Sequence, residues 1–489
     1  MSFVSKVETT YRRLVRHGWW AVVLLGGFLR FYNLGYPKAL IFDETFYVKD
    51  AWSLIHRGYE TSWPVGADAR WAAGDPSGFT DAGSFVVHPP LGKFLISLPM
   101  VLFGAEHSWT WRFSSAIFGT LAILLVMLVA KKLLGSQSAA VLAGLLFAID
   151  GHAIVLARTA LLDGFLMFFV LLAFYFLLLD RDQMRLRYQL DATRVFWKRP
   201  WLVAMAAALG LATSVKWSGL YVAAFFGVYI VVSEALLRRR LGSKTWVSDG
   251  FVGQKLADLA LTVPVFAGVY VFNWLGWILT DGGWDRHSKG TWWESLAQYH
   301  HDIYNFHVNL HTPHSYASNP FSWLFMLRPV SFWWQSSECP PNPNGCAAEI
   351  SAIGNPFIWW AAAIACIYLL VHYIRFRNRT EGLILLGLAA GYLPWMLYLN
   401  RTIFQFYAIT FLPFTVTGLV YVLRSLWYRV TPNYFNREDN TGVYRWRLPI
   451  AIYLLCVGLI SFYFLNLVWG FTTPYWYWLA HMWLGNWWI

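Results

Sequence analysis

Charged residues are scarce in this chain of 489 residues. Asp, Glu, Lys and Arg make up 13% of it, whereas ordinary soluble domains contain about 25%. Only four cysteines are present, too few for a disulfide scaffold of this length. A P-loop, a nucleophile elbow and a convincing dinucleotide fingerprint are all missing from the sequence. These shortages argue against the common soluble enzyme classes and against a small disulfide-rich fold.

Hydrophobic residues, in contrast, make up 57% of the chain, and its mean hydropathy is +0.44. This composition excludes a disordered protein and predicts an all-α polytopic membrane protein, a single integral membrane domain over residues 1–489. We expect about eleven transmembrane helices, at residues 17–34, 113–130, 139–157, 164–179, 201–215, 217–236, 258–279, 356–374, 382–400, 402–423 and 448–471.

The positive charge follows this topology. If the N-terminus is cytoplasmic, 25 of the 38 Lys and Arg residues fall on the inner side of the membrane. Such an excess is typical of cytoplasmic loops. The net charge of +12 therefore indicates membrane orientation, and we expect no nucleic acid partner.

Two further helical segments lie outside the predicted spans. Residues 91–104 are apolar, but they contain Pro99 and fall short of the ~17 residues that a crossing needs. Residues 43–57 show helical periodicity with polar positions interspersed. We interpret both as interfacial helices on the outer surface. Residues 36–109 then form a first extracytoplasmic loop with the two interfacial helices, and residues 280–355 form a second large one.

Ionisable residues at span ends gather at one membrane face, the outer one, where they suit a substrate that carries an anionic group and gives up a proton. They are Asp43, Glu44, Arg112, Asp150, His152, Arg158, Asp163, Lys216 and Arg401.

Structural roles compete with this interpretation. Asp43 can cap the helix that follows it, and Glu44 can interact with the dipole of the first turn. Arg158 and Asp163 are close enough in sequence for an ion pair, and Lys216 can extend its amine to the lipid headgroups. Spacing alone does not choose between these roles.

Five histidines cluster in the second outer loop: His300, His301, His307, His311 and His314. His307 and His311 are four residues apart, a spacing that metal ligands on one helical face can use. Because no Cys or paired Glu motif accompanies them, we favour polar residues that face the substrate. A divalent metal is not indicated strongly enough to assign ligands.

The cysteines fall into two pairs. Cys339 and Cys346 flank a turn rich in Pro and Asn in the second outer loop, where an oxidising compartment would allow a disulfide. Cys366 and Cys456 lie within predicted spans, where they pack as small apolar residues.

Several motifs, in order along nearly the whole chain, resemble the protein O-mannosyltransferases. They are Phe42 to Tyr47, His88 to Lys93, Trp111 to Phe113 with Ile117 to Gly119, Ala157 to Asp163, Gly210 to Trp217, and His314 to Ser318 with Arg328 to Val330. The resemblance implies a C-type glycosyltransferase fold with an extracytoplasmic active site. It further implies inverting transfer of mannose from a polyprenyl-phosphate carrier to Ser or Thr hydroxyls of proteins that cross the membrane.

The resemblance also implies roles for residues. Asp43 corresponds to the acid that activates the acceptor hydroxyl, Glu44 to its partner and Asp163 to a second acid near the site. Arg112 and Lys216 match positions associated with the donor phosphate. The other candidates are Arg158, Arg401, Gln405 and Tyr407 on the donor side, and His88, Lys93 and His314 on the acceptor side or in the loops.

The sequence differs from part of the family in one way, and this difference indicates which branch it resembles. Eukaryotic members carry a β-trefoil domain in the second large loop, and residues 280–355 are too few to hold it. The resemblance is therefore to the bacterial type, which acts in the cell membrane on an undecaprenyl- or decaprenyl-type donor. The expected partners are this lipid donor, Ser/Thr-containing acceptor proteins, membrane lipids and the secretion machinery.

Three alternatives remain open. The chain could transfer another sugar from a similar lipid to a glycolipid, or assist the secretion machinery without catalysis. A secondary transporter would also be a basic protein with many spans. We would expect it to show paired repeats and charges at mid-membrane, whereas here the charges gather at one face.

Overall fold

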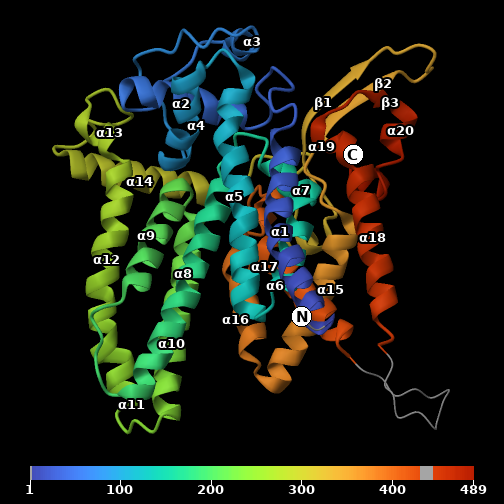
Figure 1. Cartoon of the computed structure of the whole chain (residues 1–489). Coiled ribbons are helices and arrows are strands. Elements are labelled where there is room, and N and C mark those ends of the chain that lie inside the picture. Colours follow the sequence, from blue (N-terminus) through green and yellow to red (C-terminus); the bar gives the residue numbers. More distant parts are fainter. Residues whose placement is uncertain (1–2, 430–443) are drawn as a thin grey trace.

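The computed structural model describes residues 3–429 and 444–489 as a bundle of long helices (Figure 1). One end of the bundle carries α2 (Glu44–Arg57), α3 (Ala67–Ala72), α14 (Trp292–Val308) and a small sheet. The start of α1 (Phe3–Phe31) and the short α11 (Trp246–Ser248) lie at the opposite end. The two expected outer loops therefore meet at one end of the molecule.

Six segments of the described chain are helical, long enough and apolar enough to cross a membrane. They are α5 (Ser108–Leu134), α8 (Asp163–Leu190), α10 (Ser218–Arg240), α11 to α12 (Trp246–Asn273), α15 (Pro356–Phe376), and α16 with η3 (Arg379–Leu397). Five shorter helices are also apolar: α4 (Leu91–Phe103), α6 (Gln137–Ala148), α9 (Pro200–Val215), α17 (Leu412–Trp427) and α18 (Arg447–Tyr463). The all-α, multi-span class is confirmed, whereas the count of eleven spans stays a prediction.

Short helical elements connect the long ones. They are α7 (Gly151–Leu156), α13 (Leu275–Leu279), α19 (Leu465–Trp469), α20 (Tyr475–Leu479), the π-helix η1 (Asp249–Gly253), and the 3₁₀ helices η2 (Pro320–Phe325), η3 (Leu393–Leu397), η4 (Gln405–Thr410) and η5 (Gly485–Trp487). Within the long segments, α12 itself covers Gln254–Asn273 and α16 covers Arg379–Tyr392.

The expected span at 139–157 is not one continuous helix. It breaks between α6 and α7 because Asp150 caps α7, where its carboxylate accepts a hydrogen bond from the backbone N–H of Ala153 at 3.0 Å. The same carboxylate accepts from the backbone N–H of Asn355 and the indole of Trp359, each at 2.9 Å. Asp150 thus joins α7 to the start of α15 and has a structural role.

A three-stranded antiparallel sheet, which the sequence did not predict, takes two of its strands from the second outer loop. Its strands are β1 (Ser331–Ser337), β2 (Cys346–Ser351) and β3 (Thr473–Pro474), in the order β1-β2-β3. Trp334 of β1 pairs with Glu349 of β2, and Cys346 pairs with Pro474 of β3. The loop is therefore tied to a segment that follows α18 and α19.

A buried ionic cluster ties α8, α9, α10 and α12 together at the end of α9 that lies away from the outer loops. Arg199, the N-cap of α9, is fully buried and pairs with Asp180, with Glu234 at 2.7 Å and with Asp258 at 2.7 Å. Lys255 pairs with the same Glu234 and Asp258, each at 2.7 Å. We call these five residues the inner cluster. Every charge in it has a partner of the opposite sign.

Candidate active site

A cavity of about 450 Å³ lies where the outer loops meet the helices. It is bounded by the α9–α10 junction, α12, α14, η3 and η4. The lining residues used below are His88, Lys216, Trp217, Tyr221, His307, Tyr398, Arg401 and Tyr407. Both cations and aromatic rings face this space, so the cavity suits a ligand with an anionic group and an apolar part.

Lys216 is the cation on the helix side of the cavity. It forms the C-cap of α9, and its Nζ lies 3.0 Å and 3.1 Å from the two carboxylate oxygens of Asp163, the first residue of α8. The ammonium also lies 4.7 Å from the ring centre of Tyr407. Lys216 is thus held by one carboxylate and one aromatic face at the wall of a cavity, and an interaction with lipid headgroups does not account for it.

Arg401 is the second cation at the cavity, and His307 of α14 holds it. One guanidinium nitrogen of Arg401 donates to Nδ1 of His307 at 2.9 Å, and Nε2 of His307 donates to the carbonyl of Val87 at 2.8 Å. A carbonyl only accepts and a guanidinium only donates, so this pattern requires the neutral imidazole with its proton on Nε2. Burial, with the charge of Arg401, lowers the pKa of His307 to about 4.

His88 completes this side of the site. Its ring stacks on His307 with 5.1 Å between ring centres. Burial first, then the charge of Lys216, lowers the pKa of His88 well below its usual value. The backbone carbonyl of His88 accepts from the ammonium of Lys93 at 3.1 Å, and Lys93 also forms a buried ion pair with Glu60. Lys93 therefore supports the loop that carries His88.

Asp43 is a carboxylate whose charge interacts with those of Lys216 and Asp163. It precedes α2, yet its side chain makes no hydrogen bond to the helix N-terminus, so the capping role does not hold. The pKa of Asp43 is raised to about 6: burial raises it most, Lys216 lowers it, Asp163 raises it, and a hydrogen bond from Tyr47 lowers it. A carboxylate with a pKa this close to neutrality is suited to accept a proton.

Phe42 sets the backbone that presents Asp43, a role that sequence reasoning missed. It has a φ of 47°, which is rare for a bulky residue, within a turn closed by the N–H of Glu44 and the carbonyl of Ile41 at 2.9 Å. Its ring stacks on Phe332 of β1 with 4.9 Å between centres, and Phe404 and Phe406 meet it edge-on. These contacts offset the strain of the turn.

Glu44 and Arg112 form a buried bidentate ion pair beside this turn. Nε and Nη2 of Arg112 each donate to the Glu44 carboxylate at 2.8 Å, and the remaining donors reach the carbonyls of Leu34, Pro37 and Ala39. Glu44 also accepts from the backbone N–H groups of Ile41 and Ala160. No N–H of Arg112 remains for a phosphate, so the structure places it away from the donor role that the resemblance implied.

Arg158 does not pair with Asp163 among the described residues. Its guanidinium instead donates to carbonyls at the end of α1, those of Arg30 at 2.9 Å, Tyr32 at 2.5 Å and Asn33 at 3.1 Å. A cation at the C-terminus of a helix satisfies its last carbonyls and interacts favourably with its dipole. Arg158 thus fixes the end of α1 and lies outside the residues that line the cavity.

The chain is similar to known proteins over most of its length. A family profile described as dolichyl-phosphate-mannose-protein mannosyltransferase matches residues 106–261. A second, described as the C-terminal four TMM region of protein-O-mannosyltransferase, matches residues 292–487. The polyprenol-phosphate-mannose–protein mannosyltransferase of Corynebacterium glutamicum is 31% identical over 98% of this chain and 94% of its own length. The chain belongs to the protein mannosyltransferase family.

Solved structures share the fold of this family member. The protein O-mannosyltransferase Pmt1-Pmt2 complex of S. cerevisiae, bound to the sugar donor, superposes with a TM-score of 0.69 at 14% identity, covering 93% of this chain and 90% of the matched one. ArnT from Cupriavidus metallidurans, bound to undecaprenyl phosphate, gives 0.51 at 17% identity over 92% and 76%. The expected C-type glycosyltransferase fold is confirmed.

The remaining candidates of this mannosyltransferase family member occupy different places. Tyr407 lines the cavity, whereas Gln405 is fully buried in η4, and its amide has no hydrogen-bond partner among the described residues. His314 is exposed, and its ring lies 5.0 Å from that of Phe404, close to Phe42. Tyr221 and Tyr398, which are hydrogen-bonded to each other across the cavity, were missed because they lie in apolar stretches without a motif.

The histidines of the second outer loop do not form a metal site in the part of the chain that the structure describes. No group of three or more His, Cys, Asp or Glu residues there is placed to hold a metal ion. His307 and His311 share no helical face because α14 ends at Val308. His300 instead accepts from the hydroxyl of Tyr270 at 2.8 Å and donates to the carbonyl of Leu296.

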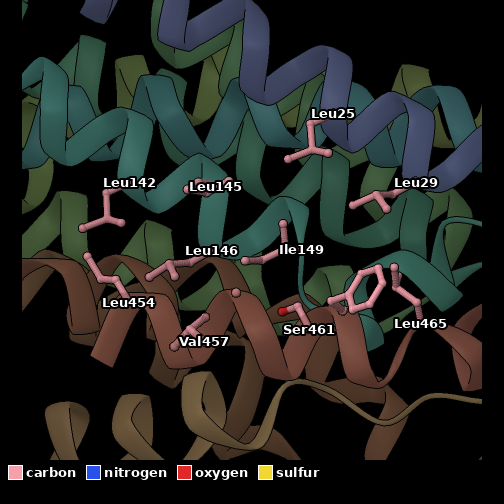
Figure 2. Close-up of a pocket in the computed structure, with 12 residues that line it drawn as sticks. Leu25, Leu29, Leu142, Leu145, Leu146, Ile149, Leu454, Val457, Ser461 and Leu465 are labelled. Atoms are coloured by element: carbon pink, nitrogen blue, oxygen red, sulfur yellow. The ribbon is translucent and has the colours of Figure 1, made fainter. Parts of the chain in front are cut away.

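A second cavity, of about 350 Å³, lies between α1, α6 and α18 (Figure 2). Its lining consists of leucines, Ile149, Val457 and Phe462, apart from Gly458 and the hydroxyl of Ser461, which accepts from Asn355 at 2.8 Å. In the described part of the chain, no charged side chain lines it. The cavity is therefore a space for apolar chains and carries no chemistry of its own.

Proposed function

We propose that the chain transfers mannose from a polyprenyl-phosphate-mannose donor to Ser or Thr hydroxyls of secreted or membrane proteins, with inversion at the anomeric carbon. One observation carries the proposal: Lys216 and Arg401 line one cavity, and Asp43, a carboxylate with a raised pKa, is close enough to Lys216 for their charges to interact. The name of the C. glutamicum relative and its identity over nearly the whole chain support the choice of substrates.

The donor phosphate is placed at the two cations. Lys216 keeps ammonium protons that Asp163 does not use, and His307 turns Arg401 toward the cavity. As the bond between the anomeric carbon and the phosphate oxygen breaks, negative charge develops on the phosphate, and fixed cations in a site with little water stabilise it. No general acid is then needed, because polyprenyl phosphate leaves as the anion. The prenyl chain is expected to leave the cavity past apolar residues such as Leu220 and Phe266.

The acceptor hydroxyl is placed at Asp43. The hydroxyl oxygen attacks the anomeric carbon on the face opposite the phosphate, and its proton passes to the Asp43 carboxylate. A positioned base of this kind contributes typically 10²- to 10⁴-fold to a rate. Displacement in one step inverts the sugar and leaves no covalent bond to the enzyme. Glu44, Arg112 and Phe42 act through Asp43 as positioning residues.

The site is placed on the extracytoplasmic side of the cell membrane, with the N-terminus in the cytoplasm. Two observations support this orientation: most Lys and Arg residues fall in the segments assigned to the inner side, and both outer loops share one end of the bundle (Figure 1). Acceptor proteins would then meet the site as they emerge from the secretion machinery, still extended.

Transfer by the purified protein tests the proposal. The protein in lipid nanodiscs is given polyprenyl-phosphate-[³H]mannose and either a Ser/Thr-rich peptide or a membrane glycolipid fraction. We expect label in the peptide, released as mannose by alkaline β-elimination. Label that enters only the glycolipid fraction would instead support the alternative acceptor class, and label in neither would contradict both.

A further inference from the structure

The two edges of the small outer sheet differ in how well they are protected. β3 forms one edge with only two residues, Thr473 and Pro474, and proline blocks further pairing. β1 forms the other edge with seven residues, and Trp334 to Ser337 are exposed. In an antiparallel pair, alternate residues turn their N–H and C=O groups away from the partner strand. Among the described residues, no backbone group bonds to that side of Trp334–Ser337.

The sequence of β1 leaves this edge open. Natural proteins usually block a free edge with lysine, proline, a bulge or a short strand. The seven residues of β1, SFWWQSS, contain no charge and no proline, and the irregularity in the register lies between Ser331 and Trp333, before the exposed part. An unblocked edge of this kind is a template for another extended chain.

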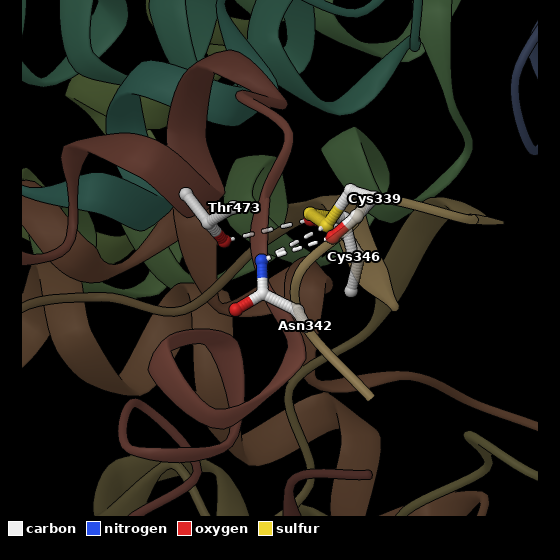
Figure 3. Close-up of a disulfide and its surroundings, with 5 residues drawn as sticks. Cys339, Asn342, Cys346 and Thr473 are labelled. Carbon is white, nitrogen blue, oxygen red and sulfur yellow. Dashed lines mark hydrogen bonds between the residues drawn. A yellow bond between two sulfur atoms is a disulfide. The ribbon is translucent and has the colours of Figure 1, made fainter. Parts of the chain in front are cut away.

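The hairpin that carries the edge is held rigidly. A disulfide joins Cys339 and Cys346 across the turn, and Asn342 donates to the carbonyl of Cys339 at 3.2 Å (Figure 3). On the face of the sheet, the indole of Trp478 donates to the buried carboxylate of Glu349 at 2.5 Å. A strand that is already ordered loses little conformational entropy when a partner strand binds to it, so the entropic cost of binding is smaller.

The start of β1 leads directly to the proposed base. Phe332 stacks on Phe42, the residue before Asp43, and Trp333 meets Tyr36 edge-on at 5.4 Å. Neighbouring strands lie about 4.8 Å apart, and each residue advances a strand by about 3.4 Å. A chain that pairs with Trp334–Ser337 therefore continues, within a few residues, past Phe332 to the region of Asp43.

We propose that the open edge of β1 docks an extended segment of the acceptor polypeptide, which adds to the sheet as a further strand and brings a Ser or Thr hydroxyl to Asp43. The inference rests on the proposed function. An uncharged strand edge binds a partner through backbone hydrogen bonds, so it accepts many sequences but excludes folded segments. This suits an enzyme that modifies chains before they fold. Folded proteins are poor acceptors on this account, because their strands are already paired.

Backbone-methylated acceptors test the docking without altering the enzyme. Single N–H groups of a Ser/Thr-rich peptide are replaced by N–CH₃, one position at a time, on either side of the reactive residue. If the peptide docks as a strand, methylation at every second position removes a hydrogen bond to β1 and raises the acceptor KM about tenfold, whereas the intervening positions stay within about twofold. Good transfer to the parent peptide with no alternation along the scan would overturn the docking and leave the proposed function standing.

Photo-crosslinking gives a readout that does not depend on turnover. A peptide carrying a diazirine beside its Ser or Thr is irradiated with the wild-type protein in nanodiscs, and the adducts are mapped by mass spectrometry. We expect adducts on Trp334–Ser337 that unlabelled peptide competes away. Adducts confined to other segments overturn the docking.

Discussion

The two ends of α9 carry buried cations with opposite surroundings. Arg199 at the N-cap is enclosed by three carboxylates, and the rest of the inner cluster pairs all its charges internally. Lys216 at the C-cap has one carboxylate partner and lines a cavity of about 450 Å³. The same contrast separates neighbours in sequence: Glu44 is saturated by Arg112 and two backbone N–H groups, whereas Asp43 is not. Saturated charges hold the helices together, and unsaturated ones at a cavity are free to act on a ligand.

The largest expected effect follows from removing the unsaturated acid. Asp43→Asn keeps the size of the side chain but cannot accept the hydroxyl proton, so the transfer rate should fall by about 10²- to 10⁴-fold. Initial rates with labelled donor and peptide measure it. The matched control is Asp281→Asn, an exposed carboxylate of the second outer loop, which should transfer at the wild-type rate. Wild-type transfer by Asp43→Asn would remove the base from the mechanism.

Mutation of the inner cluster should lower the stability of the protein and leave donor binding unchanged. Arg199→Met takes the cation from Asp180 and leaves Glu234 and Asp258 with Lys255 alone, and breaking a buried ionic network in this way costs about 3–5 kcal/mol. Thermal unfolding in detergent should show a marked fall in Tm, while the folded fraction still binds donor with wild-type affinity. A variant with unchanged Tm but weakened donor binding would reverse the roles assigned to the two ends of α9.

Lys216→Ala should weaken the donor interaction selectively. Hydrogen bonds to charged groups contribute about 1.5–3 kcal/mol, so we expect the donor KM to rise about 10- to 100-fold, with a much smaller change in the acceptor KM. Lys289→Ala, at an exposed position of the second outer loop, serves as the control and should change neither constant. An equal rise in both constants would point to general disruption of the site.

The smallest effect is a pH dependence near neutrality. The base acts as the carboxylate, and burial raises the pKa of Asp43 to about 6. Transfer should therefore be nearly constant at pH 7 to 8 and fall about tenfold per pH unit well below pH 6. Donor binding is measured over the same pH range. If it stays constant while the transfer rate falls, the fall is due to protonation of Asp43 and not to loss of the phosphate site. A rate that stays constant down to pH 4.5 would contradict the assignment.

The helical framework could be predicted from the sequence, because the lengths of the apolar segments and the positions of Lys and Arg are local signals. The segments 43–57 and 91–104 appear as α2 and α4, and three of the charges expected at the outer face, Asp43, Asp163 and Lys216, interact with one another. The positions where helices break were harder to predict from the sequence. The one at Asp150 depends on a cap that also joins Asn355 and Trp359, which are more than 200 residues away in sequence.

The division of roles among the charges was beyond sequence reasoning. Arg112, Arg158 and Lys216 look alike as cations at span ends, yet the first two meet backbone carbonyls supplied by the end of α1 and the loop after it. The sheet was missed because β3 contributes only two residues, Thr473 and Pro474, which lie far along the chain from Ser337, the last residue of β1. Phe42 carries no sequence signal for a positive φ, since glycine or asparagine would be expected there.

Direct titration of donor binding to two variants tests the central contrast most closely. Polyprenyl-phosphate-mannose is titrated into Asp43→Asn and Lys216→Ala in nanodiscs, without acceptor. The account predicts a wild-type Kd for Asp43→Asn and a Kd about 10- to 100-fold weaker for Lys216→Ala. The opposite pattern, with donor binding lost in Asp43→Asn and unchanged in Lys216→Ala, would contradict it.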